Sequence, residues 1–448
     1  MEGNRRNHAG LTLTLDGTIQ NLREKKMKKW YSLIDKIYRK KNLIEAYKRV
    51  RRNKGAPGID GVTVGAYGEK LHENTEKLHH ELKTGTYEPS AVKRVEIPKP
   101  DGSSRLLGIP TVRDRVVQQA MLNILQPIFE PAFHPSSYGY RPGGSCQKAV
   151  AKAERFMNRY GLEHVVDMDL SKCFDRLDHE QIIKSVNRKV SDGKVLKLIK
   201  QFLKTGIMKE GKYEVTEVGS PQGGVISPLL ANIYLDEFDQ KMRQKGIRIV
   251  RYADDILIFA RSPRGARKNL QIAKEILEDE LKLTINEKKT KITQVNKGVE
   301  YLGFIIRERT ISINPKRIKR FKDKIRELTP RNHGMNVESM IKRLNPVIRG
   351  WANYFRIAKC KKLFQRLAEW IRRRLRMKQM KEWKSWKPLF KTLRRNGYTG
   401  EYKKISMTRW RNSVSPLIHR AIPNKWFDDN GLINLGTYET GILSHYYE

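Results

Sequence analysis

The stretch "RYADDILIFA", residues 251–260, sets two adjacent carboxylates between runs of branched and aromatic residues. Asp254 and Asp255 repel each other at close range, and burying either one without a partner would cost several kcal/mol. The pair therefore either faces solvent or holds cations. Together with the preceding "RIV", the pattern predicts two strands folded back on each other at "ADD", a hairpin whose tip presents both acids.

A further acid ends another apolar strand, "HVVDMDL" at 164–170. Asp169 beside Asp254 and Asp255 would form a carboxylate cluster able to hold two Mg2+ ions roughly 3.5 to 4 Å apart, the arrangement used for in-line phosphoryl transfer in polymerases and nucleases. Alternation along a strand puts Asp167 and Asp169 on the same face, so spacing alone leaves both residues open as ligands.

The charge of the chain indicates a polyanionic partner. The 448 residues carry 91 Lys and Arg against 48 Asp and Glu, a formal net charge of +43, which favours nucleic acid over an anionic membrane. Residues 311–400 hold 27 basic and 5 acidic side chains, about half of that excess. Aromatic and aliphatic residues recur there at helix-like spacing between the basic ones, which predicts a basic helical bundle with a nucleic-acid surface.

The remaining composition favours a cytosolic protein. No apolar stretch approaches the roughly 18 residues of a membrane-spanning helix, and the N-terminus does not resemble a signal peptide. Cys146, Cys173 and Cys360 lie far apart, so we expect reduced thiols rather than disulfides or a zinc site.

Upstream segments predict mixed secondary structure. Leu43, Ala46, Tyr47 and Val50 share one face of a helix that stops at the glycine-rich "NKGAPGIDG". "AVKRVEIPKPDGSSRLLGIP", residues 91–110, predicts a hairpin turning at "PDGSS".

The paired acids belong to an ordered series of motifs that resembles one known family. "YADD" resembles the YxDD motif of reverse transcriptases, and "VVDMDLSKCFDRLDH" at 165–179 resembles the motif that supplies their first metal-binding aspartate. "PQGGVISPLLANIYLDEFD" at 221–239 is similar to the QGxxxSP form of group II intron reverse transcriptases, also called maturases. The resemblance spans roughly residues 42–380 and includes "NKGAPGIDG", "IPKPDGSSRLLGIPTVRDRVVQQA", "SSYGYRPGGSCQKAV", "INEKKTKI", "EYLGFII" and "NPVIRGWANYF".

The resemblance implies an α+β fold, a right-hand polymerase whose fingers and palm are built on an antiparallel sheet and are followed by an α-helical thumb or maturase domain. The implied domains are an N-terminal extension at 1–40, fingers and palm at 41–310, the thumb or maturase domain at 311–385, and a basic DNA-binding extension at 386–448. Nothing after residue 380 resembles the endonuclease domain of many group II intron proteins. The chain therefore looks like the bacterial class C members that lack it.

The resemblance also implies how the metal ions are held. Asp169 and Asp254 would bind the ions, Asp255 would assist beside them, and the carbonyl of Leu170 would be a further ligand. Asp167 becomes the second choice. The implied cofactor is a pair of Mg2+ ions, for which Mn2+ can substitute.

Several residues match the family's nucleotide-binding positions. Phe174 matches the aromatic gate that lies under the sugar and excludes a 2'-hydroxyl, although a core aromatic would look the same. Lys99 and Arg105 flank the fingers turn, where a point charge and a bidentate fork suit a triphosphate. Gln222 matches the glutamine packed near the nucleotide, followed by glycines that permit close backbone approach.

Three further roles follow from the resemblance. Lys289 would assist near the pyrophosphate, with Lys288 an equally placed neighbour. "YLGF" resembles the primer grip, where a plain buried strand is the alternative; its residues are Tyr301, Leu302, Gly303 and Phe304. RNA binding is assigned to the basic bundle, through Arg349, Arg372, Arg373 and Arg374.

The predicted function is RNA-directed DNA synthesis by a group II intron protein that copies intron RNA and assists its splicing and mobility. The expected partners are intron RNA, a DNA primer or target and dNTPs, with no membrane, in the bacterial cytoplasm. Two alternatives stay open: a reverse transcriptase co-opted for another role such as phage defence, and an RNA-binding maturase whose polymerase site is idle. The intact acids and Gln222 argue against an idle site.

Overall fold

The computed structural model describes residues 29–98, 104–171, 173–209, 212–214, 223–332 and 334–447. Lys99, Gln222 and most of the expected N-terminal extension lie outside these residues, as does the side chain of Arg105. The chain divides into two units. The first comprises residues 1–135, 170–244 and 273–285, and the second comprises residues 136–169, 245–272 and 286–448.

The first unit contains a four-stranded sheet in the order β2-β1-β4-β5. β1 (Val92–Pro98) and β2 (Ser104–Ile109) pair antiparallel, which confirms the hairpin predicted at "PDGSS". β4 (Ile207–Lys209) pairs parallel with β1 and antiparallel with β5 (Lys212–Glu214).

Helices make up most of the rest of the first unit. In α3 (Lys40–Arg52) the face formed by Leu43, Ala46, Tyr47 and Val50 is buried, as the spacing predicted, and it packs against α6 (Val112–Phe129). The hydroxyl of Thr111 caps α6 by accepting a hydrogen bond from the backbone N–H of Asp114. The described part of this unit also contains α2 (Ile34–Ile37), α4 (Val64–Glu69), α5 (Leu71–Thr84), α8 (His179–Asn187), α9 (Gly193–Lys204), α10 (Ser227–Gln244) and the short helices η1 (Glu130–Ala132), η3 (Cys173–Arg176) and η4 (Glu275–Glu280).

The second unit is built on an antiparallel sheet in the order β6-β7-β3-β8, which we call the β3 sheet. Its strands are β3 (His164–Asp169), β6 (Arg248–Tyr252), β7 (Asp255–Ala260) and β8 (Lys291–Gln294). β6 and β7 form the hairpin predicted from "RYADDILIFA", and β3 pairs with both β7 and β8. The side chains of Val165, Val250 and Leu257 anchor these strands in the hydrophobic core.

A second, three-stranded sheet follows in the same unit, in the order β11-β10-β9. Its strands are β9 (Val299–Tyr301), β10 (Phe304–Arg307) and β11 (Thr310–Ile313). The helix α7 (Cys146–Glu154) also belongs to this unit, and α11 (Pro263–Lys274) begins within it.

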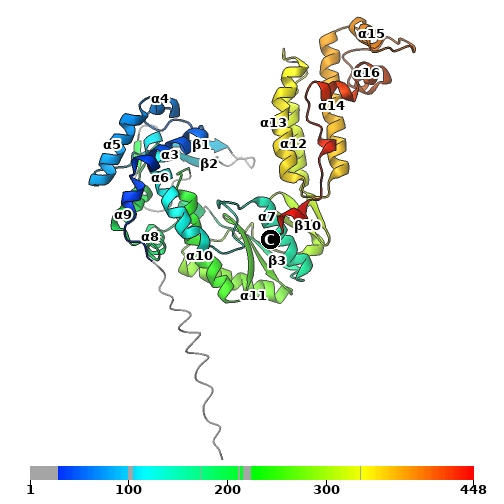
Figure 1. The fold of residues 1–448 in the computed structure, drawn as a ribbon. Helices are drawn as coiled ribbons and strands as arrows, with labels where there is room; N and C mark the ends of the chain where they lie inside the picture. The colour runs from blue at the N-terminus through cyan, green and yellow to red at the C-terminus, as the bar shows by residue number, and fades with distance from the viewer. Residues whose placement is uncertain are drawn as a thin grey trace, which may run out of the picture. The chain divides into compact units, whose positions relative to one another are not determined.

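Basic helices complete the second unit, which confirms the helical bundle. Figure 1 shows α12 (Pro315–Leu328) and α13 (Val337–Phe355) running side by side. The predicted run of apolar residues is divided between α13 and α14 (Lys361–Trp383), because the chain leaves the helix at 356–360. Three shorter helices follow: α15 (Trp386–Arg395), α16 (Pro416–Ala421) and α17 (Asn424–Asp429). One core continues from the β3 sheet through these helices to Ile442.

Two further expectations concern membranes and thiols. Among the helices that the structure describes, none is long and apolar enough to span a bilayer. The three cysteines are free thiols, as expected; Cys173 and Cys360 are buried, and Cys146 is half-buried.

Candidate active site

The tip of the β6–β7 hairpin is a two-residue turn, Ala253–Asp254. Tyr252 and Asp255 are paired at the ends of the two strands, so Asp254 lies in the turn and Asp255 begins β7. Ala253 has a φ of 59°, a left-handed conformation that is uncommon for a residue with a side chain. The tight turn fixes both aspartates on a rigid support.

The register of the β3 sheet brings the third acid, Asp169, beside them. Asp169, the last residue of β3, is directly opposite Asp255. Asp167 lies two residues earlier on β3, opposite Leu257, and it forms an ion pair with Lys291 of β8 at 3.6 Å. We call Asp167, Asp169, Asp254 and Asp255 the carboxylate cluster.

Residues 286–289, just before β8, hold Asp169 in place. Its Oδ2 accepts hydrogen bonds from Asn286 Nδ2 at 3.2 Å and from Lys289 Nζ at 3.0 Å, and its carbonyl accepts from the N–H of Asn286 at 2.9 Å. Of the two lysines that the resemblance leaves open near the pyrophosphate, Lys289 contacts Asp169, and both lysines are exposed.

The electrostatics of the carboxylate cluster favour a bound cation. Asp255 has solvent access, yet protein surrounds it closely enough that desolvation, together with the charges of Asp254, Asp169 and Asp167, raises its pKa to about 7. Burial also raises the pKa of Asp167, with Lys291 opposing the shift. The raised pKa of Asp255 reflects burial first and the like charges around it second, and a bound cation would offset that repulsion.

The donor set fits hard divalent cations, which prefer carboxylate and carbonyl oxygens. In the described residues no three His, Cys, Asp or Glu side chains are already arranged as a metal site. The carboxylate cluster supplies oxygen ligands and negative charge of the kind that divalent metal ions require in sites of phosphoryl transfer.

A buried arginine, Arg251, stabilises the turn through a hydrogen bond. Arg251 has no exposed surface, and its Nη1 donates to the carbonyl oxygen of Ala253 at 3.1 Å. Its backbone also binds the neighbouring segment: the N–H donates to Ser136 O, and the carbonyl accepts from the N–H of Tyr138, both at 2.9 Å. Sequence reasoning missed this residue, although a charge inside an otherwise apolar strand was a signal.

The same segment explains the glycine in "SSYGY". A Cβ added at Gly139 would lie 2.3 Å from the backbone nitrogen of Ala253, so only glycine allows this close approach to the turn. The "SSYGYRPGG" block thus packs against the outer edge of the hairpin that carries the two aspartates.

A pocket of about 610 Å3 adjoins Asp255. The "YLGF" segment contributes Leu302 and Gly303, which both have positive φ and form the turn between β9 and β10. The segment is therefore a tight hairpin turn rather than a plain buried strand. Tyr354 of α13 donates from its hydroxyl to the carbonyl of Leu302 at 2.8 Å. The cationic side of the pocket comes from one face of α12: Arg317, Arg320 and Lys324.

Other predicted residues lie in the first unit. Leu170 forms an antiparallel bridge with Ile285, and Phe174 is buried in η3 with 8% of its surface exposed. Gly223 has a φ of 125°, and a Cβ there would lie 2.1 Å from the carbonyl oxygen of Gly108. Gly223 thus permits close backbone approach to β2.

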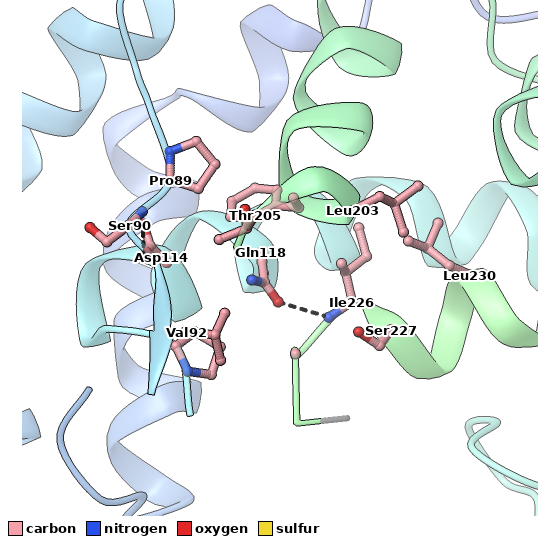
Figure 2. A pocket seen from close by; sticks show the side chains of 13 residues that line it. Pro89, Ser90, Val92, Asp114, Gln118, Leu203, Thr205, Ile226, Ser227 and Leu230 are labelled. Carbon is pink, nitrogen blue, oxygen red and sulfur yellow. Dashed lines mark hydrogen bonds between the residues drawn. The ribbon is translucent and has the colours of Figure 1, made fainter. Parts of the chain in front are cut away.

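A small cavity of about 10 Å3 lies beside this glycine segment, between β1, α6, α9 and the start of α10. Figure 2 shows the side chain of Gln118 reaching across it, where Oε1 accepts a hydrogen bond from the N–H of Ile226 at 3.4 Å. Asp114, also at its wall, accepts from the hydroxyls of Tyr87 and Thr111 at 2.6 and 2.7 Å. The cavity is large enough for about one water molecule, so it belongs to the scaffold rather than to a substrate site.

The arginines predicted to bind RNA differ in their surroundings. Arg349 is exposed on α13. On α14, Arg374 donates to Thr329 Oγ1 at 2.7 Å and to its carbonyl at 2.8 Å, and Arg373 donates to Ser413 Oγ at 3.3 Å and lies over the ring of Trp410. Arg372 contacts Asn434 at 3.5 Å. The three arginines of α14 therefore also hold protein segments together.

Comparison with known families identifies two stretches of the chain. Residues 97–306 match the family described as reverse transcriptase (RNA-dependent DNA polymerase), and residues 318–398 match the group II intron, maturase-specific domain.

Individual proteins agree with these matches. The chain is 35% identical to Protein YkfC of Escherichia coli (strain K12) over 60% of this chain and 81% of that protein. It is 33% identical to the group II intron-encoded protein LtrA of Lactococcus lactis subsp. cremoris over 59% of this chain and 54% of LtrA, so it spans about half of that relative. An apo telomerase structure from Candida tropicalis has a TM-score of 0.41 at 13% identity, covering 56% of this chain and 60% of that one, too low a score to add to the assignment. With its antiparallel sheets and following helices, the chain has the expected α+β reverse transcriptase fold and belongs to the group II intron reverse transcriptases, RNA-directed DNA polymerases that carry a maturase domain.

Proposed function

We propose that the chain extends a DNA primer on an RNA template with dNTPs at the carboxylate cluster, and that it copies and helps to splice a group II intron RNA. The observation that carries the proposal is the register that sets Asp169 opposite Asp255, next to Asp254 in the turn. Asp169, Asp254 and Asp255, with the carbonyl of Leu170, would hold Mg2+. When bound, the metal ions activate the primer 3'-hydroxyl and neutralise charge on the leaving pyrophosphate.

The chain's own residues have separate tasks in this proposal. The cationic face of α12 and the "YLGF" turn, which line the pocket beside Asp255, would hold the primer strand. Lys289, which contacts Asp169, would lie near the pyrophosphate. Lys99, Arg105 and Gln222 would contact the nucleotide. We keep the domain boundaries at residues 40, 310 and 385 as part of the proposal.

Sugar selection is assigned to Phe174. Replacing it with alanine would remove the aromatic edge that excludes a 2'-hydroxyl, so the use of rNTPs relative to dNTPs should rise. Competing the two nucleotides in single-nucleotide extension measures this ratio. An unchanged ratio in an active, folded variant would make Phe174 a core residue only.

The proposed activity is tested with a DNA primer annealed to an RNA template. We expect dNTP-dependent extension in Mg2+, none after chelation with EDTA, and recovery when Mg2+ or Mn2+ is restored. Efficient RNA binding without any extension by the wild-type chain would instead indicate a maturase with an idle polymerase site.

A further inference from the structure

A second large pocket lies far along the chain from the carboxylate cluster, in the C-terminal segment. Its volume is about 790 Å3, within the range of roughly 300–1,000 Å3 that is typical of ligand sites. The end of α15, the start and end of α16, and α17 form its walls. We call it the α15–α17 pocket.

The walls combine cations with one aromatic ring. Arg395, Arg420 and Lys425 line the pocket, and Asp429 is the carboxylate that accompanies them. Within the described ranges none of these three cations forms an ion pair, so their charge is available to an incoming anion. Trp426 also lines the pocket and is half-buried, with its ring packed at 88° to that of Phe427.

Two further residues of the pocket wall, Val414 and His419, are suited to contact a nucleobase rather than a simple anion. Val414 is a rare exposed aliphatic residue, with 49% of its surface accessible. Burial, together with the positive charges of Arg376 and Arg372, lowers the pKa of His419, so its ring is neutral at pH 7 and offers one donor and one acceptor.

The frame of the pocket is fixed from beneath. Arg376, with 3% of its surface exposed, donates to the carbonyl of Ile422 and to Asn424 Oδ1, both at 2.9 Å, at the junction between α16 and α17. Asn396 Nδ2 donates to the carbonyls of Arg420 and Ala421, both at 3.1 Å, which ties α15 to α16. These contacts hold the three helices in one arrangement, so the pocket is preformed.

We propose that the α15–α17 pocket binds an unpaired nucleotide of a single-stranded nucleic acid. The base packs against Trp426 and Val414, and the neighbouring phosphates lie on the three cations. An aromatic platform inside a basic groove is the general chemistry of single-strand binding, whereas a duplex keeps its bases stacked and unavailable. The inference rests on the proposed nucleic-acid-binding role of residues 386–448 and narrows it to one site and one ligand class.

The test uses the full chain with saturating template-primer, so that the polymerase site is occupied. Fluorescein-labelled oligo(dT), oligo(U) and a DNA duplex of equal length are titrated by anisotropy. We expect Trp426→Ala to weaken single-strand binding by about tenfold, since stacking on an aromatic side chain is a large part of such binding. Trp426→Tyr should retain most of the affinity, and Lys83→Gln, an exposed cation of α5 in the first unit, should change it by less than about twofold.

Crosslinking locates the contact independently of protein stability. Wild-type protein irradiated with an oligonucleotide containing 5-iodouracil should crosslink at Trp426, as read by mass spectrometry. The preference for oligo(dT) or oligo(U) identifies DNA or RNA as the source of the strand. Wild-type affinity in Trp426→Ala, equal binding of the duplex, or crosslinks confined to other segments would overturn the proposal.

Primer extension by the same wild-type preparation separates this proposal from the proposed polymerase activity. Extension together with Trp426-independent binding would reject the pocket alone. Trp426-dependent binding without extension would reject the polymerase proposal alone.

Discussion

Arg251 donates a hydrogen bond to the carbonyl oxygen of Ala253, 3.1 Å away, from a side chain that has no exposed surface. The bond joins the end of β6 to the turn that carries Asp254. Ala253 occupies a left-handed conformation, which persists only where its surroundings hold it. We infer that Arg251 keeps the turn in the shape that presents the two aspartates.

Replacing Arg251 with methionine should therefore affect both stability and metal use. A hydrogen bond to a charged group contributes about 1.5–3 kcal/mol, so the variant should unfold more easily by about that amount. It should also need several times more Mg2+ for half-maximal extension, because the turn is less well held. Thermal unfolding and Mg2+ titrations would check this. Arg248→Met, at the exposed start of the same strand, is the matched control. An unchanged Mg2+ requirement in a destabilised variant would limit Arg251 to a structural role.

The pKa of Asp255 predicts how metal affinity depends on pH. Its pKa is raised to about 7 without metal, so below pH 7 a proton competes with the cation. Mg2+ affinity should fall by about tenfold per pH unit below 7 and level off above it. Calorimetric titrations at pH 6, 7 and 8 would show this. A flat profile across that range would contradict the shifted pKa.

The raised pKa of Asp255 also predicts how the stability of the metal-free protein depends on pH. The folded state keeps its proton up to about pH 7, whereas the unfolded carboxyl loses it near its ordinary pKa of about 3.9. The unfolded state therefore binds fewer protons in this window, and stability should fall as pH rises from about 4 to about 7. In EDTA, Asp255→Asn should remove this part of the pH dependence, as measured by denaturant unfolding at several pH values. Equal slopes of unfolding free energy against pH in the wild type and the variant would contradict this prediction.

Tyr354 connects α13 to the "YLGF" turn. Its hydroxyl donates to the carbonyl of Leu302, and its ring stacks on Phe304 at 5.7 Å. Tyr354→Phe keeps the ring and removes the hydrogen bond, a loss of about 0.5–1.5 kcal/mol. The KM for primer should rise about two- to tenfold with little change in the single-turnover rate at saturation. A lower rate at unchanged KM would exclude a role in holding the primer.

We expect Arg374 to stabilise the folded protein, whether or not RNA is bound. Its guanidinium donates twice to Thr329, which is 3% exposed. Arg374→Gln should cost about 1.5–3 kcal/mol in unfolding free energy, whereas Arg366→Gln, exposed on the same helix, should lie within about 0.5 kcal/mol of wild type. Urea unfolding of both variants measures this difference in unfolding free energy. Equal unfolding free energies would show that Arg374 does not stabilise the fold, which would leave RNA binding as its role.

The β6–β7 hairpin could be predicted from sequence because its pattern is local. Strand alternation in "RYADDILIFA", with polar residues at the turn, is enough to place Asp254 and Asp255 at its tip. The strand pattern placed an acid of residues 164–170 beside this pair but left both Asp167 and Asp169 open. Only the resemblance to a family favoured Asp169, since its pairing with Asp255 depends on a sheet register between segments 86 residues apart.

Contacts set by tertiary packing could not be predicted. The periodicity of residues 351–375 predicted helix correctly but did not reveal the break at 356–360, because apolar spacing happens to continue across it. The α14 arginines look like a solvent-facing basic run in sequence, yet their partners Thr329, Ser413 and Asn434 come from distant segments. Likewise, nothing local to Tyr354 indicates its bond to Leu302.

The most direct measurement of the central claim is primer extension by Asp254→Asn beside an RNA-binding curve for the same protein. Asparagine keeps the size of the side chain but removes a charged metal ligand in the turn, far along the chain from the basic helices. We predict that extension is abolished while the Kd for RNA changes by less than about threefold. Full extension activity in Asp254→Asn, under conditions where the wild-type chain is active, would contradict the account.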